Sequence, residues 1–217
     1  MAESSGFLSC LDDIASECGK VSRTTVHGTV STEAAAKKNR HIQRGLPAAT
    51  VQAAATGNIR SAVEHLASSR SLQAEQLPGL IVAVNRELTK NVSASPGAFR
   101  DFDSDRFPYL PARLIREFFA EFAIFLSDAL ASSNPSDSES AVVFGRIHWD
   151  LNVYGHVFAD GCGRTATVLA AWAYWRGQRT IPRLPSRGEY LSLAGAGGRD
   201  EFIGSLAARL ADPRPSR

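Results

Sequence analysis

Large apolar side chains recur at intervals of three and four residues along much of this chain, and that spacing restricts it to a fold of packed helices. In the clearest run, Pro111 marks the start of a helix and the polar segment near Ser133 its end. Six apolar residues share one face of this helix: Leu114, Ile115, Phe118, Phe122, Phe125 and Leu126. A stripe this wide must be covered by other helices.

The apolar spacing and the helix start and stop signals along the chain predict an all-α domain with one irregular segment and no internal repeat. Gly57 weakens one helical segment and favours a break there. Residues 92–110 hold Pro, Gly, Asp and Ser, lack helical period and are compatible with a short hairpin. Helices are expected over residues 32–45, 47–70, 78–91, 141–155, 163–177, 189–193 and 200–210.

The 217 residues suffice for one ordinary domain with an extension. Hydrophobic residues at 44% and charged residues at 21% are typical of a globular chain. Residues 51–217 are expected to form the core domain. Residues 1–50 are expected to form an N-terminal helical extension or linker, with a short amphipathic helix from Phe7 to Cys18.

Charge and cysteine content narrow the classes of function. A formal net charge of +2 argues against a nucleic-acid partner, and no apolar run is long enough to span a membrane. Three cysteines and the absence of a signal-peptide pattern favour a reducing, cytoplasmic compartment, although export as an effector would leave no mark in the composition. The Ala and Arg content hints at a GC-rich bacterial genome. Nothing in the sequence indicates an oligomeric state.

The stretch HVFADGCGRTAT, residues 156–167, carries the chemistry of the chain. We expect Gly161, Cys162 and Gly163 to lie at the N-terminus of the following helix. There their amide N–H groups and the helix dipole would form an anion site suited to phosphate. Arg164 would add a planar donor fork.

Two more side chains of this stretch suit phosphate chemistry. Asp160 could hold a divalent cation that bridges phosphate oxygens, and His156 has the pKa range to take a proton from an attacking hydroxyl. The alternative is structural, because a Gly-rich helix start beside His and Asp often serves only as a cap and a turn.

These residues resemble the Fic motif HxFx(D/E)GNGRxxR. Six positions match, namely His156, Phe158, Asp160, Gly161, Gly163 and Arg164. The resemblance extends in the same order over the chain from about Ala54 to Leu210. It includes the helix LIVAVNRELTK, a flap segment SPGAFRDF within about residues 92–104, the start of a helix at FPYLPARL, and the tyrosine-bearing SRGEYLSL.

The resemblance implies a Fic-type helical bundle with a short β-hairpin flap, and an enzyme that moves AMP from ATP, with Mg²⁺, onto a hydroxyl of a protein. In that scheme His156 is the general base and Asp160 the metal ligand. Gly161, Cys162, Gly163 and Arg164 bind the phosphates of the nucleotide donor. The flap residues Gly97, Phe99 and Arg100 dock the target by strand-like pairing.

Two motif positions depart from the family pattern. Cys162 replaces an asparagine, so a weak donor replaces a side-chain amide. Its thiol would serve packing or the loop, with a reactive thiol as the alternative. Thr167 replaces the second arginine, which binds the terminal phosphate of ATP in the family, so a usual ATP pose loses a bidentate contact.

The segment TGNIRS, residues 56–61, resembles the family's self-inhibitory helix, but Arg60 stands at the glutamate position. Arg60 is therefore a candidate to supply the positive charge that Thr167 lacks, with an ordinary helix surface as the alternative. Three functions stay open. The first is adenylylation of a protein. The second is transfer from a non-ATP donor, such as UTP, a CDP-linked compound or a phosphoryl donor, with a small molecule as a possible acceptor, and the third is a catalytically silent binding module.

Overall fold

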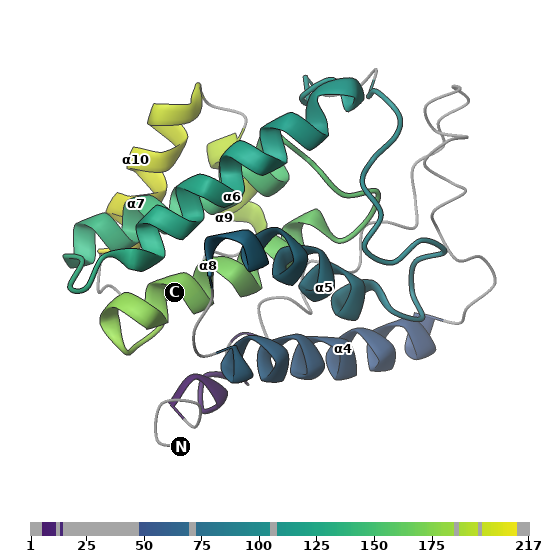
Figure 1. The fold of residues 1–217 in the computed structure, drawn as a ribbon, viewed down its shortest axis with the longest axis horizontal. Helices are drawn as coiled ribbons and strands as arrows, with labels where there is room; N and C mark the ends of the chain where they lie inside the picture. Colours follow the sequence, from purple (N-terminus) through teal and green to yellow (C-terminus); the bar gives the residue numbers. More distant parts are fainter. Residues whose placement is uncertain are drawn as a thin grey trace.

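The computed structural model describes residues 6–11, 14, 48–69, 73–104, 108–184, 187–194 and 197–211, and every structural statement below concerns these residues. Most of them form helices (Figure 1). The helix expected over residues 32–45 lies outside the described residues. The helices are α4 (Ala48–Ser68), α5 (Leu77–Thr89), α6 (Ile115–Ala131), α7 (Asp137–His148), α8 (Cys162–Gln178), α9 (Arg187–Ala194) and α10 (Arg199–Leu210), with short 3₁₀ turns at Ala74–Gln76 and Ala112–Leu114.

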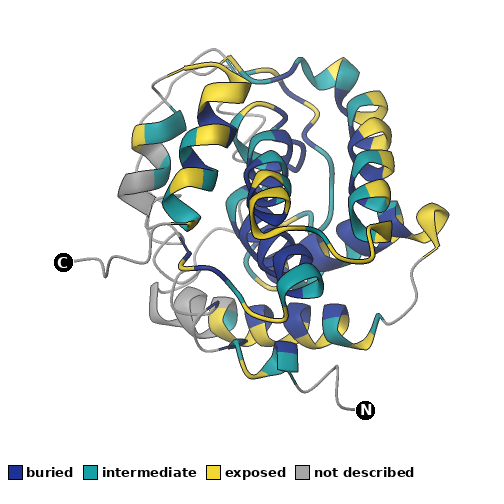
Figure 2. Ribbon diagram, turned by 90° about the vertical axis from the view of Figure 1, so that its left-hand side faces the viewer, coloured by how far each residue is buried: buried dark blue, intermediate teal, exposed yellow. Residues whose placement is uncertain are grey.

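Helix α8 forms the centre of the molecule. Its residues from Arg164 to Trp175 are all buried, including the polar Thr165 and Thr167. Figure 2 shows the buried residues gathered at the centre, while the outer helices turn exposed residues outward. The N-terminal residue Phe7 packs its ring on Trp175, at 5.5 Å between ring centroids.

Helices α4 and α5 lie along one side of α8. Helix α4 continues through Gly57 without the expected break. This glycine faces open space, so neither a close contact nor a turn at this position interrupts the helix. The Asn58 amide nitrogen, Nδ2, donates to the Lys90 carbonyl oxygen at 2.6 Å, which fastens α4 to the end of α5. This bond fixes the segment that leads toward the flap.

Helix α6 carries the apolar stripe predicted from the sequence, rotated by a small angle. Its buried residues are Ile115, Phe119, Phe122, Ala123 and Leu126. Phe118 and Phe125 are only partly buried because the helix turns its 115–119–122–126 line toward the core. None of the described helices is long and apolar enough to cross a membrane.

The segment expected to be the flap does not show the predicted hairpin among its described residues. It forms an antiparallel bridge to the motif stretch instead, in which Phe99 pairs with Phe158. The Arg100 amide donates to the Val157 carbonyl at 2.9 Å, and the Ala159 amide donates to the Ala98 carbonyl at 2.9 Å. The flap segment is thereby joined to the motif turn, which is the part of the motif stretch before α8, residues 156–161.

A π-helical turn at Trp149–Val153 joins α7 to the motif stretch. The sequence predicted one helix over residues 141–155. In the structure α7 begins earlier, where Ser136 and Glu139 form a reciprocal capping box, and ends at His148. Such π turns widen the backbone and occur often at functional sites.

Candidate functional site

The motif turn ends at Gly161, which is the N-cap residue of α8. Gly161 has φ +78°, in the left-handed region that favours glycine. A Cβ atom at this position would lie 2.5 Å from Cγ2 of Thr89. Both the backbone conformation and the closeness of α5 therefore require glycine.

The first turn of α8 presents unsatisfied backbone donors. The Thr165 amide bonds to the Gly161 carbonyl at 2.9 Å and closes the first turn. Within the part of the chain that the structure describes, the amides of Gly163 and Arg164 have no hydrogen-bond partner. Such amides at the positive end of a helix dipole attract anions.

Cys162 holds the motif turn together. Its Sγ atom donates to the Phe158 carbonyl at 3.2 Å and accepts from the Phe158 amide at 3.3 Å. The residue is only 3% exposed. A thiol can donate and accept at once, as a side-chain amide can, so it satisfies both backbone groups that the Phe99–Phe158 bridge leaves unpaired. This placement favours the loop role expected for Cys162.

Asp160 and Arg164 face one another across the turn. Arg164 Nη2 lies 3.6 Å from Asp160 Oδ1, and Arg164 Nη1 donates to the Leu88 carbonyl at 3.0 Å. Asp160 Oδ1 also accepts from the Gly161 amide at 2.7 Å. The second carboxylate oxygen, Oδ2, makes no hydrogen bond or ion pair with the described residues.

His156 sits at the start of the motif with φ +41°. Its Nδ1 atom lies 3.1 Å from the Asn152 carbonyl oxygen. Because a carbonyl oxygen only accepts, Nδ1 carries the hydrogen and Nε2 is the basic nitrogen of the ring. The Tyr109 ring stacks on the imidazole at 4.2 Å between centroids and 2° between planes, which orients the ring plane.

Asn85 links the motif turn to the flap, a role that the sequence reasoning missed. Its Nδ2 atom donates to the Asp160 carbonyl at 3.0 Å and to Thr165 Oγ1 at 2.9 Å, while its Oδ1 accepts from the Gly97 amide at 3.1 Å. Asn85 is 1% exposed. The available signal was a polar residue on the apolar stripe of a helix, next to Val84.

Gly97 and Phe99 lie beside the motif. Gly97 has φ +77°, and the Phe99 ring stacks on Phe158 at 5.6 Å between centroids. In the bridge, the amide and carbonyl of Phe99 point away from Phe158. Neither group has a hydrogen-bond partner among the described residues.

The Arg100 side chain is buried rather than displayed on a docking surface. Its guanidinium donates to the carbonyl oxygens of His156, Phe102, Leu110 and Gly155. A guanidinium offers five donors, so one side chain satisfies several inward-pointing carbonyls. Burial lowers the pKa of Arg100. The expected docking role finds no support in the placement of this side chain.

The structure does not bring Arg60 to the motif turn. Arg60 is exposed on α4, and it has no hydrogen bond or ion pair with any described residue. Thr167 is buried, and its hydroxyl donates to the Gly163 carbonyl at 2.9 Å within α8. A role for Arg60 in donor binding stays a prediction.

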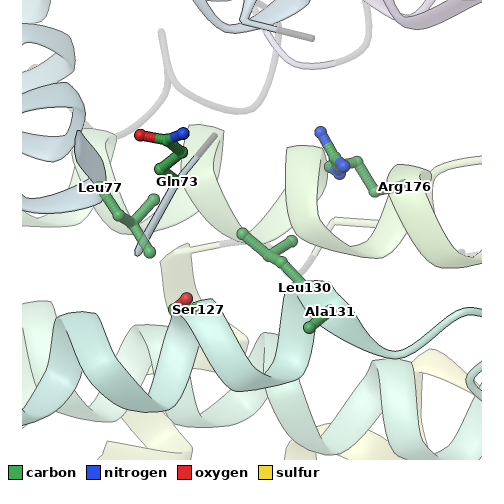
Figure 3. Close-up of a pocket in the computed structure, with 6 residues that line it drawn as sticks. All are labelled: Gln73, Leu77, Ser127, Leu130, Ala131 and Arg176. Carbon is green, nitrogen blue, oxygen red and sulfur yellow. The ribbon is translucent and has the colours of Figure 1, made fainter. Parts of the chain in front are cut away.

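Among the described residues, two of the hollows are lined by side chains from outside the motif stretch of residues 156–167. One of about 110 Å³ is found between α6 and the C-terminal end of α8, about 20 Å along that helix from Cys162. Figure 3 shows its lining residues: Gln73, Leu77, Ser127, Leu130, Ala131 and Arg176. The other, of about 180 Å³, lies beside the π turn and is lined by Arg146 and Asp150 among others. No cluster of three or more metal-ligating side chains occurs among the described residues.

Comparisons with known proteins add a likeness to a solved structure. No protein-family model and no curated protein matches the chain. A crystal structure described as a Fic family protein from Desulfovibrio desulfuricans G20 is similar to this chain, with 15% sequence identity and a TM-score of 0.46. The alignment covers 94% of this chain and 71% of that chain.

Proposed function

We propose that this chain is a transferase of the Fic type, which moves a nucleotidyl or related phosphate-containing group from a diphosphate donor to a hydroxyl. The acceptor is a protein, and AMP from ATP is the transfer that the motif resemblance implies. One observation carries the proposal. A histidine with its basic nitrogen defined by an Nδ1 hydrogen bond shares a short turn with unpaired amides at a helix N-terminus.

The division of labour follows from phosphoryl chemistry. The acceptor hydroxyl would give its proton to Nε2 of His156 while its oxygen forms a bond to phosphorus and the bond to the leaving phosphate breaks. The amides of Gly163 and Arg164 would hold phosphate oxygens. Because such reactions depend on alignment and charge neutralisation, a preformed turn supplies most of what is needed.

A magnesium ion fits the donor set at Asp160. Mg²⁺ is usually held by one or two carboxylates together with substrate phosphates, so a single carboxylate with an unpaired Oδ2 suffices. Bound there, the ion would neutralise charge on the donor's phosphate oxygens. Arg164, paired with Oδ1, would keep the carboxylate oriented.

The target would pair with the flap at Phe99. The amide and carbonyl of this residue are unpaired among the described residues and point away from the motif bridge. An extended acceptor segment could hydrogen-bond to both groups, and such pairing needs little target sequence. Gly97 and Phe99 thus remain candidates for docking through the backbone and the ring.

A second candidate function, transfer from a donor other than ATP, is favoured by Thr167. Its hydroxyl is engaged with the Gly163 carbonyl, and α8 offers no guanidinium at this position for a terminal phosphate. A donor with only two phosphates, such as a CDP-linked compound, would not need that contact. The two candidates share the same turn and the same base.

A labelling experiment tests both candidates. Purified protein is incubated with Mg²⁺ and separately with α-labelled ATP, α-labelled UTP or a labelled CDP-linked donor, in the presence of candidate acceptor proteins. We expect transfer from at least one donor in the parent protein. Transfer should fall at least about a hundredfold in His156→Ala, which lacks the base.

The matched control is His65→Ala, which makes the same change at an exposed position on α4 and should transfer at the parent rate. Donor binding without transfer in the parent would favour a silent binding module. Transfer that persists in His156→Ala would contradict the proposed base.

A further inference from the structure

A chain of hydrogen bonds runs from His156 to helix α9. The Asn152 carbonyl accepts from Nδ1 of His156 at 3.1 Å, and the Asn152 side chain donates through Nδ2 to the Tyr190 hydroxyl at 2.6 Å. Tyr190 belongs to α9, which follows the motif helix in the chain. Two separate parts of the fold therefore meet at Asn152.

The Tyr190 hydroxyl is itself held in place. It donates to the His148 carbonyl at 3.4 Å, and its ring packs against the His148 ring at 5.1 Å and the Phe202 ring at 5.7 Å between centroids. Burial raises the pKa of Tyr190, so the hydroxyl keeps its proton and stays a donor. The Tyr190 hydroxyl therefore accepts from Asn152 within the π turn and donates to His148, which directly precedes this turn.

The backbone around Asn152 needs such support. Asn152 lies in the π turn, where the Tyr154 amide reaches back to the Trp149 carbonyl at 2.9 Å. The next bond, from the Val157 amide to the Leu151 carbonyl, is long at 3.4 Å. A wide turn bounded by a long bond leaves the direction of the Asn152 carbonyl less constrained than in an α-helix.

We propose that Tyr190 is a positioning residue for His156. By anchoring the Asn152 side chain from α9, it keeps the Asn152 carbonyl on Nδ1, so that in the neutral ring the hydrogen lies on Nδ1 and Nε2 is aimed as the base. The effect on the tautomer is a property of the folded protein. Only its catalytic consequence rests on the proposed function.

Imidazole ¹⁵N chemical shifts report the tautomer without any activity. In the parent protein we expect the His156 ring, assigned by its absence in His156→Ala, to be almost wholly the Nδ1–H form. In Tyr190→Phe the Nε2–H form should rise at least about threefold, because the carbonyl that selects the tautomer is no longer fixed. With an active donor, kcat should fall about tenfold while the donor KM stays within about twofold.

Tyr154→Phe is the matched control. It removes the same hydroxyl from a tyrosine that directly follows the same π turn, is exposed, and makes no hydrogen bond through its hydroxyl with the described residues. We expect the tautomer of His156 and kcat to stay at the parent values. A shift of equal size in this variant would show a general disturbance of the turn and would overturn the proposal.

Asn152→Leu provides a second route to the same answer. It removes the amide that Tyr190 holds while leaving a side chain of similar size. The tautomer should shift as in Tyr190→Phe, and the double variant should show no further shift, because both changes break one chain of bonds. Additive shifts would contradict the proposed order of contacts.

The outcomes separate this proposal from the proposed function. A folded Tyr190→Phe with an unchanged His156 tautomer overturns the positioning role, even if the protein transfers a group. A shifted tautomer in a protein that transfers nothing supports the positioning role and counts against the transferase. If Tyr190→Phe does not fold, Asn152→Leu gives the same two readings.

Discussion

At the scale of single residues, the site depends on side chains that satisfy backbone groups. Cys162 bonds to both the amide and the carbonyl of Phe158, and Arg100 donates to four carbonyls around the motif. Leaving such buried groups unpaired would cost on the order of 1–3 kcal/mol each. The residues that shape the turn are therefore as important to the site as those that would touch a ligand.

Glycine at position 161 can be tested directly. We expect Gly161→Ala to lower the free energy of unfolding by about 1–3 kcal/mol, because the new Cβ would meet Thr89 and φ is +78°. The measurement is urea unfolding followed by circular dichroism. The control is Gly57→Ala in the interior of α4, where a Cβ meets nothing within 4 Å. It should stabilise by about 0.5–1 kcal/mol. Equal effects at the two positions would contradict the strain argument.

At the scale of elements, the sequence predicted helices better than their junctions. Periodicity located α5, α6 and α8 because each has an apolar face that the core must cover. It missed the end of α7 at His148, since a π turn keeps nearly the same apolar pattern as an α-helix. It also missed Asn85, whose burial is explained only by the turn and flap that meet over α5.

The end of α7 carries a pH-dependent contribution to stability. His148 is buried, neither ring nitrogen has a hydrogen-bond partner in the described structure, and burial lowers its pKa to about 3. Between about pH 6.5 and pH 3, His148 binds a proton in the unfolded chain but stays neutral in the folded chain. Stability is therefore lost as pH falls from about 6.5 toward about 3, at up to about 1.4 kcal/mol per pH unit.

The check is the slope of unfolding free energy against pH between 6.5 and 4, in the parent protein and in His148→Phe. The variant should show a shallower fall on acidification. Burial raises the pKa of the neighbouring Asp150, which has the opposite effect on the slope but is present in both proteins. Identical slopes would mean that His148 titrates normally in the folded state.

At the scale of the whole molecule, distant segments meet at the motif turn. The flap pairs with residues 157–159, α5 contributes Asn85 and the Leu88 carbonyl, and α8 supplies the amides. The sequence located the motif because its residues are contiguous. It did not show that the Arg100 side chain is a clamp rather than a docking group, because that depends on carbonyls turned inward from three segments.

Arg100 should therefore affect global stability. We expect Arg100→Met to lower the free energy of unfolding by about 3 kcal/mol or more, since several buried carbonyls lose their donor at once. Arg113→Met makes the same change at an exposed position of the 3₁₀ turn before α6 and should stay within about 0.5 kcal/mol of the parent. The measurement is the free energy of chemical unfolding of both variants. A loss in Arg100→Met as small as that in Arg113→Met would contradict the proposal that the Arg100 side chain holds these carbonyls in place.

The central claim is that the first-turn amides of α8 bind the phosphates of a donor beside His156. Amide ¹H–¹⁵N shifts, followed during titration with Mg²⁺ and each candidate donor, test it most directly. The account predicts that Gly163 and Arg164 shift most and saturate together with the His156 ring. Saturable shifts centred on the hollow around Arg176, with Gly163 and Arg164 unmoved, would contradict it.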